Sequence, residues 1–115
     1  MNAIVELAWV PVCNVDDVLP NLGVCAKVAD KQVAIFKIME NGVANLFAID
    51  NHDPFSDANV LSRGLVGDLK GHTVVASPIY KHHFDLLTGQ CLEEDVTIPV
   101  YQVRDNNGQI EVLVA

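Results

Sequence analysis

The sequence predicts an all-β fold built from short antiparallel strands, on three observations. Half of the 115 residues are apolar, and Val, Ile and Leu dominate while aromatic residues make up only 6%, which is typical of strands. Turn-forming residues recur about every ten positions, as in sandwiches and barrels. No linker, repeat or low-complexity stretch divides the chain, so we expect a single domain over residues 1–115.

The first half of the chain carries clear turn signals between its expected strands. Asn14 is expected to cap one helical turn that Pro20 ends. Asn41 and Gly42 indicate a type I′ hairpin, because both central positions of that turn need a positive φ. Strands are expected at residues 9–12, 22–29, 31–40 and 43–50. The last two should pair antiparallel across the hairpin.

The second half begins with a long excursion at residues 51–71, where Pro, Ser, Asn, Gly and Asp follow one another closely. Loops of this length in small domains are usually functional. Short strands are expected after it at residues 73–76 and 83–86, and a final hairpin pairs residues 100–104 with 109–114. Ile110, Val112 and Val114 alternate along the last strand and predict one buried face.

Charge and cysteine content exclude several classes of partner. The formal net charge is −8 and the seven Lys and Arg residues are scattered, so nucleic acid and anionic membranes are poor candidates. The first basic residue is Lys27, so the chain has no positively charged segment of the kind that begins a signal peptide. No uncharged stretch is long enough to span a bilayer. Cys13, Cys25 and Cys91 form no C-x-x-C pair and fit free thiols in a reducing compartment. We therefore expect a cytoplasmic protein outside the membrane.

Two loops in the centre of the chain carry a family resemblance. The first contains Asp53-Pro54-Phe55, the second reads Ser77-Pro78-Ile79-Tyr80, and a hairpin over residues 83–92 reads His-Phe-Asp-Leu-Leu-Thr-Gly-Gln-Cys-Leu. This order resembles the Rieske family, in which the loops read Cys-Pro-His and Cys-Pro-x-His and the hairpin Phe-Asp-x-x-Thr-Gly-x-Cys-Leu. The resemblance implies an antiparallel sandwich or barrel with a smaller cluster-binding type of subdomain at about residues 51–92.

In the Rieske family, two thiolates and two imidazoles from these loops hold a [2Fe–2S] cluster. The four matching positions here are Asp53, Phe55, Ser77 and Tyr80. A serine hydroxyl does not ionise near neutral pH, phenylalanine has no lone pair, and a lone carboxylate or phenol suits iron–sulfide ligation poorly. The resemblance therefore implies a loop frame kept without its redox chemistry. We expect the rings of Phe55 and Tyr80 to fill part of the vacated space.

A narrower resemblance rests on three segments, Asn-x-Asp-Pro-Phe-Ser at 51–56, Asn-Val-Leu-Ser-Arg-Gly-Leu-Val-Gly-Asp at 59–68 and Ser-Pro-Ile-Tyr-Lys-x-His-Phe at 77–84. These look like the small-subunit family of bacterial NADH-dependent assimilatory nitrite reductases. The resemblance implies a chain without a cofactor of its own. Its partner would be a large subunit that holds FAD, sirohaem and an iron–sulfur cluster and reduces nitrite to ammonium. Exposed apolar residues near the loops would dock on that partner, and the candidates are Phe55, Leu61 and Ile79.

Two alternatives from other functional classes stay open at the level of sequence. The first is a small metalloenzyme whose ion is bound by His52, Asp53 and His82. His82 and His83 would point to opposite faces of a strand, so both could hardly bind one ion. The second alternative is a Rieske-type electron carrier that still holds a cluster. Arg63, an isolated cation in the acidic excursion, either forms an internal ion pair or contacts a partner.

Overall fold

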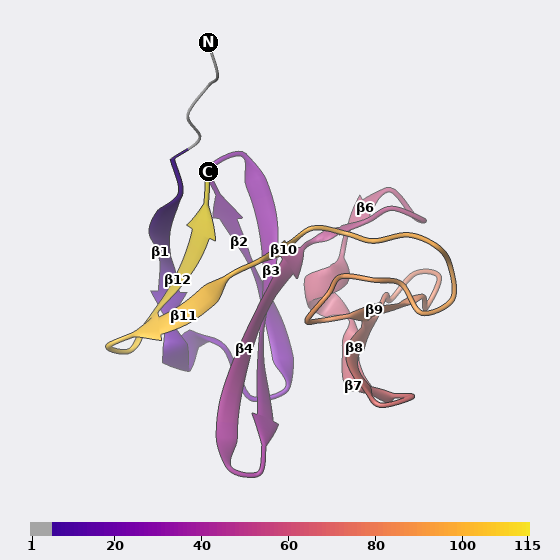
Figure 1. Cartoon of the computed structure of the whole chain (residues 1–115), viewed down its shortest axis with the longest axis horizontal. Coiled ribbons are helices and arrows are strands. Elements are labelled where there is room, and N and C mark those ends of the chain that lie inside the picture. Colours follow the sequence, from indigo (N-terminus) through magenta and orange to yellow (C-terminus); the bar gives the residue numbers. More distant parts are fainter. Residues whose placement is uncertain (1–5) are drawn as a thin grey trace.

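Two antiparallel sheets form the body of the molecule. The computed structural model describes residues 6–115. One sheet has the order β1-β12-β11 and the other the order β10-β4-β3-β2. The strands are β1 Ala8–Asn14, β2 Leu22–Val28, β3 Lys31–Glu40, β4 Val43–Asp50, β10 Val100–Tyr101, β11 Val103–Asn106 and β12 Gln109–Val114. The β1-β12-β11 sheet lies on one side of the long β3–β4 hairpin (Figure 1). The expected all-β antiparallel class is confirmed.

Both tight hairpins that the sequence predicts are present. Asn41 (φ 52°) and Gly42 (φ 77°) join β3 to β4, which pair from Glu40 and Val43 at the turn to Val33 and Asp50. A positive φ at both central positions is the type I′ geometry, whose twist matches that of the flanking strands. Asn107 (φ 53°) and Gly108 (φ 89°) make the same turn between β11 and β12.

A first apolar core lies between the two sheets. Ile110, Val112 and Val114 on β12 are buried in it, as predicted. The alternation is incomplete, because Glu111 is also buried and pairs with Arg104. The expected helical turn is the 3-10 segment η1 (Val15–Asp17), and its start is held by the N–H of Asn14, which donates to Asp17 Oδ2 over 3.0 Å. Within residues 6–115, no helix is long and apolar enough to cross a membrane.

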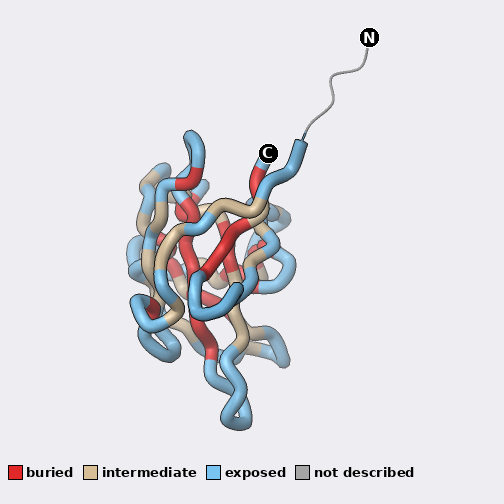
Figure 2. The backbone as a smooth tube through the Cα atoms, turned by 90° about the vertical axis from the view of Figure 1, so that its left-hand side faces the viewer, coloured by how far each residue is buried: buried red, intermediate tan, exposed pale blue. Residues whose placement is uncertain are grey.

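β3 is buried on both of its faces, and this position explains its sequence. Residues 33–38 are all buried although alternate side chains point in opposite directions. Val33 and Ile35 belong to the first core, whereas Ala34 and Phe36 belong to a second core on the other face. A strand covered on both sides reads as a near-continuous apolar run rather than an alternation. Lys37 is the one charged residue in this run, and its ammonium group donates to the carbonyl of Val15. Figure 2 shows buried segments running through the middle of the molecule, with exposed turns at the ends.

Residues 51–92, here called the loop unit, cover the second core. Their elements are β5 His52–Asp53, β6 Ala58–Asn59, the 3-10 turn η2 Leu61–Arg63, β7 Leu65–Leu69, β8 His72–Ala76 and β9 His83–Asp85. β7, β8 and β9 form one small sheet, and β5 pairs with β6. Leu61, Val75 and Phe84 of the loop unit are fully buried in the same cluster as Phe36 of β3. The loop unit therefore stands on the face of the β3–β4 hairpin that the other sheet leaves open (Figure 1).

Two elements differ from those expected from the sequence. The strand expected at residues 100–104 is interrupted at Gln102, so that β10 pairs with β4 whereas β11 pairs with β12. The chain passes from one sheet to the other at this residue. β7 lies inside residues 51–71, where the sequence predicts a loop excursion. Gly67 and Asp68 have low strand propensity, and they belong to a strand only because β7 pairs with β8.

Candidate functional site

The two loops that resemble the Rieske ligand loops lie against each other. The first loop covers residues 51–59 and the second covers residues 77–82. Ser77 donates its hydroxyl hydrogen to Asp53 Oδ2 over 2.5 Å, and both side chains are buried. Asp53 and Ser77 occupy the positions at which the family pattern has its two cysteines. The two loops are therefore joined by a side-chain hydrogen bond at the two positions where cluster-binding members of the family have cysteine thiolates.

Hydrogen bonds within each loop determine its conformation. In the first loop, Asp53 Oδ1 accepts the N–H of Phe55 over 2.9 Å, which is the Asx-turn that aspartate commonly forms. In the second loop, the carbonyl of Ser77 accepts the N–H of Lys81 over 3.1 Å, and the N–H of Ser77 donates to the carbonyl of His82 over 2.9 Å. These turns direct the Asp53 carboxylate and the Ser77 hydroxyl toward each other.

Hydrogen bonds stabilise the charge on the buried Asp53 carboxylate. Burial disfavours the ionised form and by itself raises the pKa of Asp53. The Ser77 hydroxyl and the N–H of Phe55 both donate to this carboxylate and outweigh burial, so the pKa lies below its ordinary value. The group is ionised at neutral pH. A general acid needs a raised pKa, so Asp53 is not suited to that role.

An aromatic stack fills the space beside the Asp53–Ser77 pair. The ring of Phe55 lies 3.8 Å from the ring of His82, at an interplanar angle of 11°, and 6.1 Å from the ring of Phe84. The expectation that Phe55 is a space-filling ring agrees with this stack. The same expectation for Tyr80 is wrong, because its side chain is 61% exposed. The ring that stacks on Phe55 is that of His82, and only its proximity to the second loop could have indicated this from the sequence.

The three docking candidates differ in their exposure. Ile79 is 44% exposed, and Phe55 is partly buried under the stack with His82. Leu61 is fully buried, so the expectation that it lies on an exposed patch is wrong. The 3-10 turn η2 rotates Leu61 into the second core, and the Leu61 N–H donates to the carbonyl of Asn51 over 3.1 Å. Leu65, which the sequence did not single out, is 79% exposed beside the second loop.

The three residues of the alternative metal site each contact a different partner and not one another. His52 contacts Asn59 Oδ1 through Nδ1 at 3.1 Å and Asp57 Oδ1 through Nε2 at 3.2 Å. Asp53 bonds Ser77, and His82 stacks on Phe55. In the part of the chain that the structure describes, no three His, Cys, Asp or Glu side chains gather as a group that could hold an ion. The arrangement therefore does not support the metalloenzyme reading.

The residues at the four ligand positions do not fit a [2Fe–2S] cluster. Such a cluster needs thiolates and imidazoles, and these positions offer one carboxylate, one hydroxyl, one phenyl ring and one phenol. The carboxylate and the hydroxyl bond each other, the Phe55 ring has no donor atom, and the Tyr80 side chain is exposed to solvent. No electron-transfer step is therefore assigned to this chain.

Comparison with known proteins agrees with the fold and with the narrower resemblance. A sequence model of the Rieske-like [2Fe-2S] domain matches residues 8–113. The chain is 42% identical over 105 residues to the nitrite reductase (NADH) small subunit of Escherichia coli K12, covering 90% of this chain and 95% of that protein. The NMR structure of the E. coli protein NirD superposes with a TM-score of 0.86 at 39% identity, covering 95% of this chain and 98% of NirD.

A further relative is much longer than this chain. The nitrite reductase [NAD(P)H] large subunit of Klebsiella oxytoca is 35% identical over 105 residues, which cover 90% of this chain but 11% of that protein. The fold, the matched length and the identity to proteins of the same size agree with one another. The chain belongs to the Rieske-like [2Fe-2S] domain family and, within it, to the small subunits of NADH-dependent nitrite reductase.

Proposed function

We propose that this chain is a non-catalytic subunit that assembles with the large subunit of a nitrite reductase and stabilises or tunes it. The observation that carries the proposal is the closed pair of loops. Asp53 and Ser77 bond each other and Phe55 stacks on His82, so the loops are held by side chains rather than by a cluster. A frame that keeps its shape without redox groups is suited to recognition by another protein.

The Klebsiella oxytoca relative supports this partner. A segment similar to this chain forms 11% of a protein named as a nitrite reductase large subunit. In that protein the two parts are joined covalently, which gives them a high effective concentration for each other. We infer that the corresponding parts also meet when they are separate chains. The partner of this chain is then the large subunit.

The proposal assigns all redox cofactors to the large subunit. FAD, sirohaem and an iron–sulfur cluster would carry electrons from NADH to nitrite there and yield ammonium, in nitrate assimilation. This chain would contribute a surface and no ligand. Cys13, Cys25 and Cys91 are free thiols, which fits the reducing cytoplasm in which we place the complex.

Co-expression with the large subunit tests the proposal. A tagged form of this chain is expected to co-purify the large subunit in a fixed ratio, and the chain purified alone is expected to be colourless. NADH-dependent nitrite reduction is then compared for the large subunit alone and with the chain added back. The proposal fails if no complex forms, or if the large subunit alone has the full activity and stability of the complex.

A further inference from the structure

A hollow with two unpaired cations lies beside the second loop. Its volume is about 290 Å³, and its lining includes Arg63, Leu65, Pro78, Lys81 and His83. Arg63 comes from the end of η2 and Lys81 from the end of the second loop, so segments far apart in the sequence bring these two positive charges to one place.

Neither cation is neutralised by the described part of the chain. Arg63 and Lys81 form no ion pair with any residue between 6 and 115. Three other basic groups have partners, since Arg104 pairs with Glu111 at 2.7 Å, Lys37 donates to a backbone carbonyl and Lys31 lies over the Tyr101 ring. Arg63 and Lys81 are distinguished by lining one hollow together. In a chain of net charge −8, two free cations in one hollow favour an anionic group there.

Exposed apolar side chains lie in the lining of the hollow and in the adjoining turn. Leu65 in its lining is 79% exposed. Ile79 (44% exposed) and Tyr80 (61% exposed) do not line the hollow but lie in the turn between Pro78 and Lys81, which do. Large exposed apolar and aromatic side chains around buried or charged anchors are typical of protein interfaces. The hollow is therefore more than an ion site, because a free anion would leave these side chains in water.

We propose that this face docks a segment of the large subunit that carries a carboxylate beside an apolar side chain. The carboxylate enters between Arg63 and Lys81, and the apolar side chain packs on Leu65, Ile79 and Tyr80. Guanidinium and ammonium groups both suit a carboxylate. The inference rests on the proposed function, since it names the surface through which that partner is bound.

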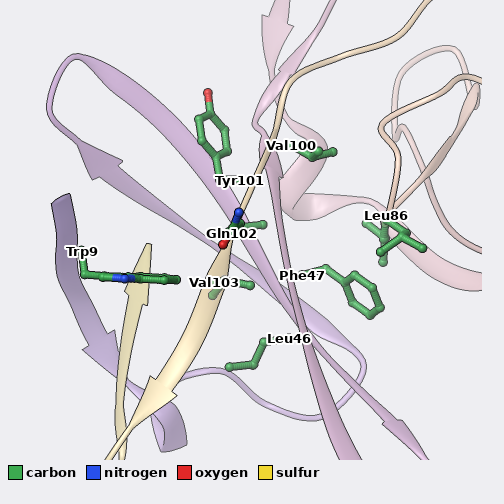
Figure 3. A pocket seen from close by; sticks show the side chains of 10 residues that line it. Trp9, Leu46, Phe47, Leu86, Val100, Tyr101, Gln102 and Val103 are labelled. Carbon is green, nitrogen blue, oxygen red and sulfur yellow. The ribbon is translucent and has the colours of Figure 1, made fainter. Parts of the chain in front are cut away.

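A larger hollow elsewhere on the molecule lacks this charge. Figure 3 shows the side chains of β1, β4, β10 and β11 that line it, among them Trp9, Phe47 and Tyr101. Its volume is about 500 Å³ and its lining residues are uncharged. Nothing in this groove selects one occupant over another, whereas the two cations beside the second loop select an acidic one.

Charge reversal tests the proposal, with the reversal of a single charge elsewhere on the chain as the control. The double variant Arg63→Glu/Lys81→Glu is compared with Lys70→Glu, which lies at the β7–β8 turn and has a positive φ like Lys81. Binding to the purified large subunit is measured by titration calorimetry at low and high salt. We expect the double variant to bind at least about tenfold more weakly and to lose salt dependence, and Lys70→Glu to bind as the wild type does.

Truncation of one apolar side chain gives a second, independent readout. Leu65→Ala removes a 79% exposed side chain beside the cations, and Leu87→Ala removes a 72% exposed one that lines the groove of Figure 3. Both variants keep the core intact because neither side chain is buried. We expect Leu65→Ala to weaken binding about tenfold and Leu87→Ala to leave it unchanged.

The outcomes separate the two proposals. If the wild-type chain forms no complex with the large subunit, the proposed function fails and the docking inference fails with it. If the wild type binds and both the double variant and Leu65→Ala bind equally well, the docking inference alone is overturned. It is also overturned if the wild type forms a dimer that the double variant abolishes, because the occupant is then a second copy of the chain.

Discussion

A carboxylate as deeply buried as that of Asp53 is stable only where donors surround it, because a buried charge without partners is very costly. Asp53 is fully buried, and Ser77 and the backbone of Phe55 supply hydrogen atoms to it. In a cluster-binding loop pair the metal ions hold the two corners together. Here the Asp53 carboxylate does so, and its hydrogen bonds are strongest while it is ionised, because a charged acceptor binds donors more tightly than a neutral one.

Removal of this carboxylate should therefore destabilise the whole chain. We expect Asp53→Ala to lower the free energy of unfolding by about 2 to 4 kcal/mol, because the Ser77 hydroxyl and the Phe55 N–H lose a charged acceptor in a buried place. Urea denaturation measures the difference. Asp68→Ala, an exposed aspartate of β7, serves as the control and should change stability by less than about 0.5 kcal/mol. Equal stability of the two variants would refute the role assigned to Asp53.

The lowered pKa of Asp53 also predicts a pH dependence. Since the folded chain binds this proton less readily than the unfolded chain, the contribution of Asp53 to stability is fully present above the unfolded pKa of about 4 and is lost as the pH falls below it. Asp85 acts in the same direction. In urea titrations from about pH 6 to pH 3, the stability of Asp53→Asn should therefore fall less steeply with acid than that of the wild type. Parallel curves would contradict the assignment.

At the residue scale, the sequence identified positions better than it identified side-chain directions. The loop positions 53 and 77 could be predicted because two prolines and the following hairpin fix the motif. The directions of Leu61 and Tyr80 could not, because neither residue lies in a strand whose alternation assigns a face. The Leu61 side chain points into the core only because η2 packs on β3. This packing is a tertiary contact, which the local sequence does not indicate.

At the element scale, the link between η2 and β7 determines where Arg63 stands. Gly64 makes this link at a place of close backbone approach, where an added Cβ would lie 2.3 Å from the carbonyl oxygen of Ala76 and 2.6 Å from a Val75 methyl group. Glycine is required here by space, since its φ of −75° is ordinary. β7 can pair closely with β8 directly after η2 only because this Cβ is missing.

A matched pair of glycine substitutions tests this close approach. Gly64→Ala should cost about 1 to 3 kcal/mol of folding free energy, because the backbone of β8 has to shift. Gly67→Ala, in the middle of β7, meets no heavy atom within 4 Å and should be neutral or slightly stabilising, since glycine is unfavourable in a strand. Thermal unfolding followed by circular dichroism compares the two. A Gly64→Ala variant as stable as Gly67→Ala would show that the backbone approach is unimportant.

The elements themselves were predictable to different degrees. The β3–β4 hairpin follows from an Asn-Gly turn between two long apolar strands, and both strands were predicted with the bounds that the structure shows. β7 and the break at Gln102 could not be predicted, because they depend on which partner strand is nearby. Local propensity identifies an element only where tertiary pairing agrees with it.

At the scale of the whole molecule, the two cores share one strand. Val33 and Ile35 face the core between the sheets, and Ala34 and Phe36 face the core under the loop unit. Loss of either core removes one cover of β3 and exposes apolar surface on the other side. We therefore expect the body and the loop unit to unfold together as one domain, as proposed for residues 1–115.

Two probes can test this cooperativity. Trp9, the single tryptophan of the chain, lies on β1 in the body, so its fluorescence reports on the body alone, whereas far-ultraviolet circular dichroism reports on all strands. The two urea transitions should coincide, as they do for small two-state domains. Separate midpoints would show that the loop unit unfolds independently and would argue against a single domain.

Native mass spectrometry of the assembled enzyme tests the central claim most directly, because it reports the partner and the metal content of this chain together. The complex of the large subunit with this chain is released stepwise in the instrument, and the small chain is weighed as it leaves. We predict a complex with the large subunit from which the chain departs at the mass of its polypeptide alone. A chain that leaves with the added mass of two iron and two sulfide ions, or one that never enters the complex, would contradict the account.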